Sequence, residues 1–510
     1  MHVTPMVRTG IALATALGTL TLTAAQSGQS QGPATTAAAT TAGSSSGGGL
    51  AGYYGQRLTW GPCPDFADTT ITCAVVKVPL NYADPGGRSI SLMIDRLPAG
   101  TPGTHPILLT NPGGPGGSGL PTPGQLRSEL PASVLNAFDI IGFDPRFIGH
   151  STPVTCGQPA EDLGGIWMRF PHPGSFPADV AAARARARAC AAYSGWALPY
   201  ATTASTARDM DIIRGVLGAP RMSFLGFSYG AYLGAVYTAL FPRRTDRFVL
   251  DSPVDPAHVW YGFGLERAGT LEIALDGFCA WLAGADSTYH FGTSAQAVRQ
   301  TWNALVAAAD ANPIKTPDGL VWTGDLIRAL TWILLYSDHN YPVLAGDLAA
   351  LAGGVSVPFP PPPPIQDPQG VPPDNNTAAY LAITCGDASS PRDPGFYRQM
   401  VATESAELPF LGGEQANITP CAFWPFQAGP PFSLTGDHAR GVLIVDSDGD
   451  PATPYSGSVL IHTDIPGSRL ITLHASVHVP YPAYGDACVN NAVSGYLATG
   501  QLPAADLTCA

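Results

Sequence analysis

Charged residues are scarce in this chain of 510 residues. They make up 12% of it, and lysine is nearly absent, since only Lys77 and Lys315 occur among the 25 basic residues. The 38 acidic residues give a net charge of −13. A protein that neutralises nucleic-acid phosphates needs a basic surface, so this balance argues against a nucleic-acid partner. The apolar share of 45% argues against a disordered acidic chain and indicates a soluble globular protein.

Long apolar runs are also missing beyond the N-terminus. There, His2 and Arg8 precede an uncharged, mildly apolar run that ends in Thr23-Ala24-Ala25, which predicts a secretory signal peptide over residues 1–25. We expect a flexible low-complexity linker over 26–52, because small polar residues cannot bury a core. No second segment approaches the roughly twenty apolar residues that span a bilayer, which predicts no stable membrane insertion. The protein is expected to be secreted, with loose retention at the cell surface as an alternative.

The nine cysteines include no C-x-x-C pair of the kind that zinc sites and thioredoxins use. Outside the cell, most of them should be oxidised. Proximity in the sequence favours one set of pairs among many: Cys63–Cys73, Cys156–Cys190, Cys385–Cys421 and Cys488–Cys509. Cys279 would remain as a buried thiol in an apolar helical stretch.

Short apolar runs alternate with helical patterns along most of the chain. The runs that predict strands cover residues 72–79, 89–95, 107–110, 138–144, 222–226, 247–251, 441–446 and 469–474. Helical spacing appears over residues 206–218, 229–241 and 486–499. Wholly apolar strands that alternate with helices predict an α/β fold with a mostly parallel sheet covered by helices on both faces.

The middle of the chain differs from both ends. Residues 257–430 contain amphipathic helical patterns, such as 265–283 and 296–311, and no repeated strand–helix units. The simplest organisation is an α/β core in two parts, residues 53–256 and 431–510, interrupted by a mainly helical cap over 257–430.

The sharpest motif is Gly226-Phe227-Ser228-Tyr229-Gly230. It follows an apolar strand and opens a helix, which is the context of a nucleophile elbow. Small residues at the two glycine positions let the backbone turn sharply and expose the serine hydroxyl. A glycine-rich turn without chemistry is the alternative, but the strand–turn–helix context favours Ser228 as a catalytic nucleophile.

A serine nucleophile needs a base and an acid that orients the base, and both are expected later in the chain. The run Asp446-Ser447-Asp448-Gly449-Asp450-Pro451 follows a predicted strand, and its proline excludes a calcium loop. Asp450 is the favoured acid because it begins the turn beyond the strand, and Asp448 is the second choice.

Two histidines near the last predicted strand compete for the role of base. His478 lies in the loop beyond that strand, where folds of this kind collect their catalytic groups, so we favour it. His474 should still lie on the strand and is more consistent with a structural role.

Residues 111–119, Asn-Pro-Gly-Gly-Pro-Gly-Gly-Ser-Gly, follow an apolar strand and supply backbone N–H groups without bulky side chains. Together with the Tyr229 N–H, the Gly114 amide is expected to form an oxyanion hole, and Gly113 is the next choice. A phosphate-binding loop is disfavoured because no P-loop lysine is present. Chemistry of this kind requires no cofactor and no metal.

With these motifs, the chain resembles the secreted actinobacterial tripeptidyl aminopeptidases and their proline-iminopeptidase-like relatives among the α/β-hydrolase serine peptidases. The resemblance extends from about Trp60 to the C-terminus and assigns Ser228, Asp450 and His478 to the family's triad positions. Phe147 and Ser252 stand where the family has glycine, and Val477-His478-Val479 replaces its Gly-His-Gly. These departures bear on the shape of the substrate pocket.

The resemblance implies an exopeptidase that acts on peptides with a free N-terminus. Such an enzyme must bind an ammonium group, usually with carboxylates near the pocket. The cap offers several carboxylates among which the sequence does not choose: Glu266, Glu272, Asp276, Asp387, Glu404 and Glu407. The alternatives are a secreted carboxylesterase on the same scaffold and a catalytically silent surface-binding protein.

Overall fold

The computed structural model describes residues 49–66, 68–159, 170–357, 370–434, 439 and 441–510. The predicted signal peptide and nearly all of the predicted linker lie outside the described residues. The last two linker positions already belong to the short helix α1 (Ala51–Tyr54).

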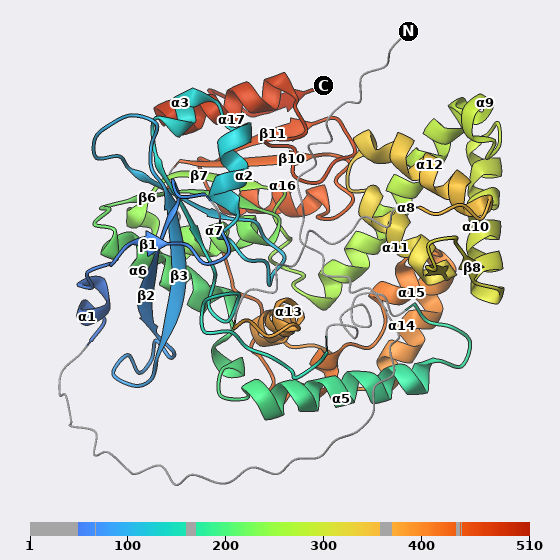
Figure 1. Ribbon diagram of the computed structural model, residues 1–510, viewed down its shortest axis with the longest axis horizontal. Helices are drawn as coiled ribbons and strands as arrows, with labels where there is room; N and C mark the ends of the chain where they lie inside the picture. Colours follow the sequence, from blue (N-terminus) through green and yellow to red (C-terminus); the bar gives the residue numbers. More distant parts are fainter. Residues whose placement is uncertain (1–48, 67, 160–169, 358–369, 435–438, 440) are drawn as a thin grey trace.

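One large sheet forms the centre of the described chain (Figure 1). In spatial order its strands are β1 (Gly61–Pro62), β2 (Thr72–Pro79), β3 (Ser89–Leu97), β5 (Asp139–Phe143), β4 (Ile107–Asn111), β6 (Met222–Phe227), β7 (Thr245–Asp251), β10 (Val442–Ser447), β11 (Arg469–Leu473) and β12 (Leu507–Cys509). From β5 to β12 the neighbours are parallel, while β1, β2 and β3 form an antiparallel edge. The mostly parallel sheet predicted from the sequence is confirmed.

Successive residues of the central strands enter two different cores. Phe224 packs with α6 (Thr203–Val216) and α7 (Tyr229–Leu240) on one face, while Leu225 packs with α2 (Thr122–Glu129), α3 (Ala132–Leu135) and α17 (Ala487–Thr499) on the other. Side chains alternate between the faces of a strand, so a strand covered on both faces must be apolar throughout. Every residue of β6 is buried for this reason.

The chain between β7 and β10, which are neighbours in the sheet, is mainly helical, and we call it the helical insertion. Its helices are α8 (Tyr261–Gly284), α9 (Asp286–Tyr289), α10 (Ala295–Ala311), α11 (Gly324–Leu334), α12 (Tyr341–Ala352), α13 (Asn375–Asp387), α14 (Pro394–Glu407) and α15 (Gly412–Gln415). Figure 1 shows α8, α10 and α12 gathered to one side of the sheet. Helices α8 and α10 to α12 share a separate apolar core, whereas α13 packs into the core of the sheet.

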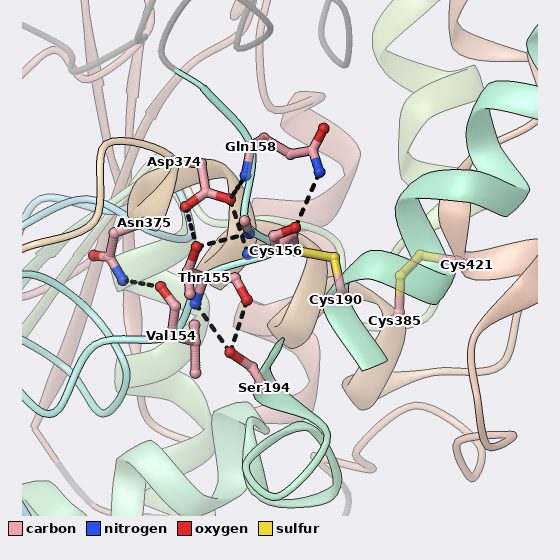
Figure 2. The surroundings of a disulfide bond; sticks show 11 residues. Val154, Thr155, Cys156, Gln158, Cys190, Ser194, Asp374, Asn375, Cys385 and Cys421 are labelled. Carbon is pink, nitrogen blue, oxygen red and sulfur yellow. Dashed lines mark hydrogen bonds between the residues drawn. A yellow bond between two sulfur atoms is a disulfide. The ribbon is translucent and has the colours of Figure 1, made fainter. Parts of the chain in front are cut away.

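The sequence did not predict α5 (Phe176–Ser194), which carries one half of a disulfide in Cys190. Its alanine–arginine alternation hides the apolar stripe that would mark an amphipathic helix. Figure 2 shows how the neighbouring loop is fixed: the Asp374 carboxylate accepts from the Cys156 N–H at 2.8 Å and from the Thr155 hydroxyl at 2.5 Å. The start of α13 is thereby tied to the disulfide-bonded loop of the core.

All four disulfide pairs predicted from proximity are present, and Cys279 is a buried free thiol. Burial raises the pKa of the Cys279 thiol to about 12, so it behaves as an apolar side chain rather than as a nucleophile. Among the helices that the structure describes, none has the length and apolar character required to cross a membrane.

Candidate active site

Ser228 lies at the sharp turn between β6 and α7. Its backbone has φ 56° and ψ −124°, a strained combination for a residue that is not glycine. The flanking glycines are required by close approach, since a Cβ at position 226 would lie 2.4 Å from the Gly230 carbonyl oxygen, and one at 230 would lie 2.5 Å from the Asn111 carbonyl oxygen. The predicted elbow geometry is therefore present, with Ser228 only partly buried.

Asp450 and His478 form a buried pair beyond the ends of β10 and β11. The Asp450 Oδ2 atom lies 2.8 Å from His478 Nδ1, and the two side chains are 0% and 1% exposed. Asp450 also accepts from the N–H groups of Ala452 and Thr453 at 2.7 and 2.8 Å. The Thr453 hydroxyl donates to Asp450 at 3.0 Å and lies 3.1 Å from His478 Nδ1. These contacts fix both the carboxylate and the ring, and leave His478 Nε2 as the nitrogen able to accept a proton.

Asp448 and His474, which the sequence analysis ranked behind Asp450 and His478, also pair with each other. Asp448 Oδ2 lies 2.5 Å from His474 Nδ1, but these side chains are 42% and 56% exposed. Our expectation that His474 lies on the strand was wrong: β11 ends at Leu473, and the His474 side chain is about half exposed to solvent. A second Asp–His pair therefore exists close by in the sequence.

The C-terminal end of β7 holds the serine loop and the histidine loop at the same edge of the sheet. Ser228 N–H donates to the Asp251 carbonyl oxygen at 2.8 Å. Val479 N–H donates to the Ser252 hydroxyl at 3.0 Å, and Tyr481 N–H donates to the Asp251 carboxylate at 3.0 Å. Among the described residues, no hydrogen bond joins the Ser228 hydroxyl to His478, and such contacts often tighten only when substrate binds.

Two further buried carboxyl groups lie behind the pair. Burial raises the pKa of Asp251 and of Asp446 well above the ordinary value, and the charge of Asp450 adds to both shifts. Ser252 Oγ lies 3.2 Å from an oxygen of each of these two groups. Burial and the neighbouring carboxylate therefore both favour the neutral forms of Asp251 and Asp446 over their ionised forms.

Gly113 packs directly against the elbow. A Cβ there would lie 2.5 Å from the Phe227 carbonyl oxygen and 3.2 Å from the Tyr229 nitrogen. The Gly113 N–H donates to the Asn111 side chain at 3.0 Å and is therefore occupied. Within the described part of the chain, the N–H groups of Gly114 and Tyr229 have no acceptor, which agrees with the choice of Gly114 over Gly113 as an oxyanion donor.

Three of the four positions where this chain departs from the family's glycines have a left-handed backbone. Phe147, Ser252 and Val479 have φ values of 73°, 53° and 64°. Glycine adopts such angles without steric cost, while other residues are held there only by their surroundings. Each side chain has a fixed place: Phe147 packs on Trp196, Ser252 joins the carboxyl groups described above, and Val479 is buried.

A cavity of about 120 Å³ lies between the helical insertion and α5. Trp260, which lines it, packs on the Tyr229 ring with centroids 5.8 Å apart. Tyr380 also lines the cavity, and its backbone nitrogen lies next to the glycine loop. A Cβ at Gly116 would lie 3.3 Å from that nitrogen. Trp260 and Tyr380 thus connect the cavity lining to Tyr229 and to the glycine loop.

The carboxylate in this cavity is Glu414, which the sequence analysis did not name. Burial raises the pKa of Glu414 to about 7, against the opposing effect of Arg267. None of the six carboxylates considered from the sequence lines the cavity. Glu272, for example, pairs with Arg299, and Asp387 accepts from Thr203. The Gly-Gly-Glu-Gln stretch of α15 contains no sequence pattern that could have identified Glu414 as a cavity residue.

Outside this region, Asp255, His258 and Glu266 could together hold a metal ion. His258 Nδ1 lies 3.1 Å from Asp255 and 2.5 Å from Glu266. The histidine and carboxylates also contact one another directly, so the cluster by itself does not identify a metal site.

The comparisons with known proteins agree with this geometry. Family models described as "alpha/beta hydrolase fold" and "TAP-like protein" match residues 106–347 and 409–509. The chain is 37% identical to a protein named Tripeptidyl aminopeptidase from Streptomyces lividans, over 86% of this chain and 84% of that protein. It is 32% identical to a protein named Carboxylesterase B from Mycobacterium tuberculosis, over 89% of this chain and 90% of that protein. The chain therefore belongs to the TAP-like family of α/β-hydrolase enzymes.

Proposed function

We propose that this protein is a secreted serine exopeptidase that removes short peptides, tripeptides in particular, from free N-termini. The observation that carries the proposal is the cavity that holds Glu414, because its lining residue Trp260 packs on Tyr229, the neighbour of Ser228. The carboxylate can bind the ammonium end of a peptide, while the reacting serine cleaves a bond at a fixed distance from that end. The name of the Streptomyces lividans relative supports the same activity.

In the proposed mechanism, Ser228 attacks the carbonyl carbon of the scissile bond while His478 Nε2 takes its proton. Asp450 holds the ring through Nδ1 and stabilises the imidazolium that forms. The N–H groups of Gly114 and Tyr229 donate to the developing oxyanion, with Gly113 shaping the turn beside them. His478 then gives its proton to the leaving amine, and water hydrolyses the acyl-enzyme with His478 again as the base. This sequence of steps uses no metal or organic cofactor.

Glu414 is the proposed partner of the substrate's ammonium group. Its pKa of about 7 makes binding dependent on pH, because only the ionised carboxylate attracts the ammonium. The group is half-buried, which strengthens the attraction relative to an exposed pair. The opposing charge of Arg267, whose Nη2 donates to Gln415 Oε1 at 2.5 Å, keeps an unoccupied Glu414 from standing as an isolated charge.

Secretion is part of the proposal. Four disulfides in one chain are typical of proteins that fold in oxidising compartments. The N-terminal sequence has the layout of a signal peptide, and the following linker could hold the enzyme loosely at the cell surface. We also keep the predicted division into a core over 53–256 and 431–510 and a cap over 257–430.

A carboxylesterase is the second candidate, favoured by the name of the Mycobacterium tuberculosis relative. An esterase needs the serine, histidine and oxyanion hole but has no use for an ammonium-binding carboxylate. The two candidates therefore differ at Glu414 and agree at Ser228.

A substrate panel separates them. We expect the mature protein to cleave a tripeptide chromogenic amide with a free N-terminus, to leave its N-acetylated form nearly untouched, and to lose all activity in Ser228→Ala. Cleavage of a short acyl ester with neither peptide touched would overturn the peptidase proposal and favour the esterase. Activity retained in Ser228→Ala would contradict both.

A further inference from the structure

The loop that carries His478 pairs with a segment of the helical insertion. Residues 336–338, between α11 and α12, lie against this loop, and Ser337 forms an antiparallel bridge with Val477. His478 N–H donates to the Tyr336 carbonyl oxygen at 2.8 Å. The backbone amide of His478 is therefore satisfied by the insertion and not by the sheet.

Asp338 extends this pairing through its side chain. Its N–H donates to the Ser476 carbonyl oxygen at 2.9 Å, and its Oδ2 accepts from the Ser476 N–H at 3.3 Å. Its other oxygen accepts from the Tyr484 hydroxyl at 3.1 Å. The neighbouring His339 ring stacks on Tyr484 with centroids 4.2 Å apart. Asp338 thus joins the residues on both sides of His478 in the sequence.

Tyr336 contacts the histidine ring directly. The two rings meet edge to face, with centroids 5.4 Å apart. Asp450 holds the same ring by its Nδ1 atom. His478 is therefore fixed from the core by a carboxylate and from the insertion by an aromatic ring.

The histidine loop also contains a strained residue. Val479, the next residue, has a left-handed φ of 64°, which a β-branched residue holds only when its surroundings impose it. A backbone amide without its partner is costly, and a small displacement of a catalytic group lowers the rate strongly. Hydrogen bonds from the strand ends hold Val479 and Tyr481, while the amide of His478 itself depends on the insertion.

We propose that Tyr336 and Asp338 are positioning residues that hold His478 in its reactive place, so that the helical insertion completes the catalytic centre as well as enclosing the substrate. The proposal rests on the proposed function, in which His478 is the base. Neither residue touches the reacting atoms, so their loss should lower kcat and leave substrate binding nearly unchanged.

The test compares Asp338→Ala and Asp338→Asn with Asp310→Ala in the full protein. Asp310 pairs with Arg328 at 3.0 Å inside the same insertion and, within the described chain, makes no hydrogen bond or ion pair with the histidine loop, which makes it a matched control. For both a free tripeptide amide and a short ester, we expect Asp338→Ala to lower kcat by about tenfold with KM changed less than about twofold. Asp338→Asn should recover most of the loss, because its amide oxygen still accepts one hydrogen bond. Asp310→Ala should match the wild type.

Wild-type kcat in a folded Asp338→Ala, or an equal loss in Asp310→Ala, would overturn the proposal. If Asp338→Ala fails to fold, Tyr336→Leu decides, since it removes the ring contact and keeps the backbone pairing: a lower kcat at unchanged KM supports the proposal, and unchanged kcat overturns it. Failure of the proposed function is seen separately, as activity that survives His478→Ala.

Discussion

Two Asp–His pairs lie close together beyond β10 and β11, and they differ in almost everything except their chemistry. Asp450 and His478 are 0% and 1% exposed, whereas Asp448 and His474 are 42% and 56% exposed. Both pairs join a carboxylate oxygen to a histidine Nδ1, at 2.8 and 2.5 Å. A short contact is therefore not what distinguishes a catalytic pair from a surface pair.

The difference lies in what surrounds each pair. The buried pair has a threonine, two backbone amides and an aromatic ring fixing its members, as well as the serine loop at the same edge of the sheet. The exposed pair lies about half in solvent, which screens its attraction. In the proposed mechanism, burial and orientation turn the same two residue types into an acid–base device, and matched substitutions in the two pairs can test this.

Replacing each histidine by alanine should give the largest difference in kcat between the two pairs. His478→Ala removes the base and is expected to lower kcat by on the order of 10⁴-fold or more, since a serine hydroxyl alone is a weak nucleophile. His474→Ala should change kcat by less than about twofold. Steady-state kinetics on the tripeptide amide measures both, and similar losses in the two variants would break the comparison.

The acids should show the same contrast at a smaller amplitude. Asp450→Asn keeps the shape of the side chain but favours the wrong histidine tautomer, so kcat should fall by roughly 10³- to 10⁴-fold. Asp448→Asn should leave kcat close to the wild-type value. A large effect at Asp448 with none at Asp450 would move the catalytic acid to the exposed pair.

A substitution at Glu414 should affect substrate binding, whereas substitutions in the buried Asp–His pair should affect the chemical step. Glu414→Gln should raise KM for free tripeptide amides by about 10- to 100-fold and leave ester hydrolysis unchanged, because the ester has no ammonium to lose. In the wild type, peptide kcat/KM should fall as the pH drops through about 7, where Glu414 takes up a proton, and the ester profile should lack this component. Equal effects on peptide and ester would show that Glu414 does not bind the ammonium.

The same substitution has a consequence for stability. A pKa raised on folding means that the folded state resists ionisation, so the cost in free energy of unfolding grows as the pH rises from about 4.5, the unfolded value, to about 7, and then stays constant. Glu414→Gln removes this cost. Its melting temperature should exceed that of the wild type at pH 8 by more than it does at pH 5. A gap that widens on acidification would contradict the raised pKa.

Ser252 gives the smallest expected effect and tests how the buried pair is held. Ser252→Ala leaves the Val479 N–H without its acceptor and keeps the left-handed backbone, which should cost about 1–3 kcal/mol. Ser252→Gly loses the same hydrogen bond but relieves the backbone, so it should be more stable than the alanine variant by about 0.5–1 kcal/mol. Chemical denaturation measures the difference, and a less stable glycine variant would show that the backbone there is not strained.

The strands and the elbow could be predicted because their signals are local. The predicted strand over 72–79 and the helix starting at Tyr229 coincide with β2 and α7, since apolar runs and a glycine-bounded serine depend only on nearby residues. The four disulfides also followed from short separations along the chain. His478 and Asp450 could be chosen because each lies just beyond a strand.

Features that depend on distant segments could not be predicted. Glu414 lines the cavity only because α15 packs next to α8, which no pattern in the sequence encodes. His474 was expected on a strand that ends one residue earlier, because the apolar pattern does not show where the strand ends. The pairing of Ser337 with Val477 joins segments separated by most of the insertion and part of the core.

The most direct test of the central claim is to map the site that a small fluorophosphonate modifies, by mass spectrometry of the digested protein. The buried pair should activate one hydroxyl, so we predict rapid modification of Ser228 in the wild type and in His474→Ala, and none on the same timescale in His478→Ala. Modification of another residue, or of Ser228 at the wild-type rate in His478→Ala, would contradict the account.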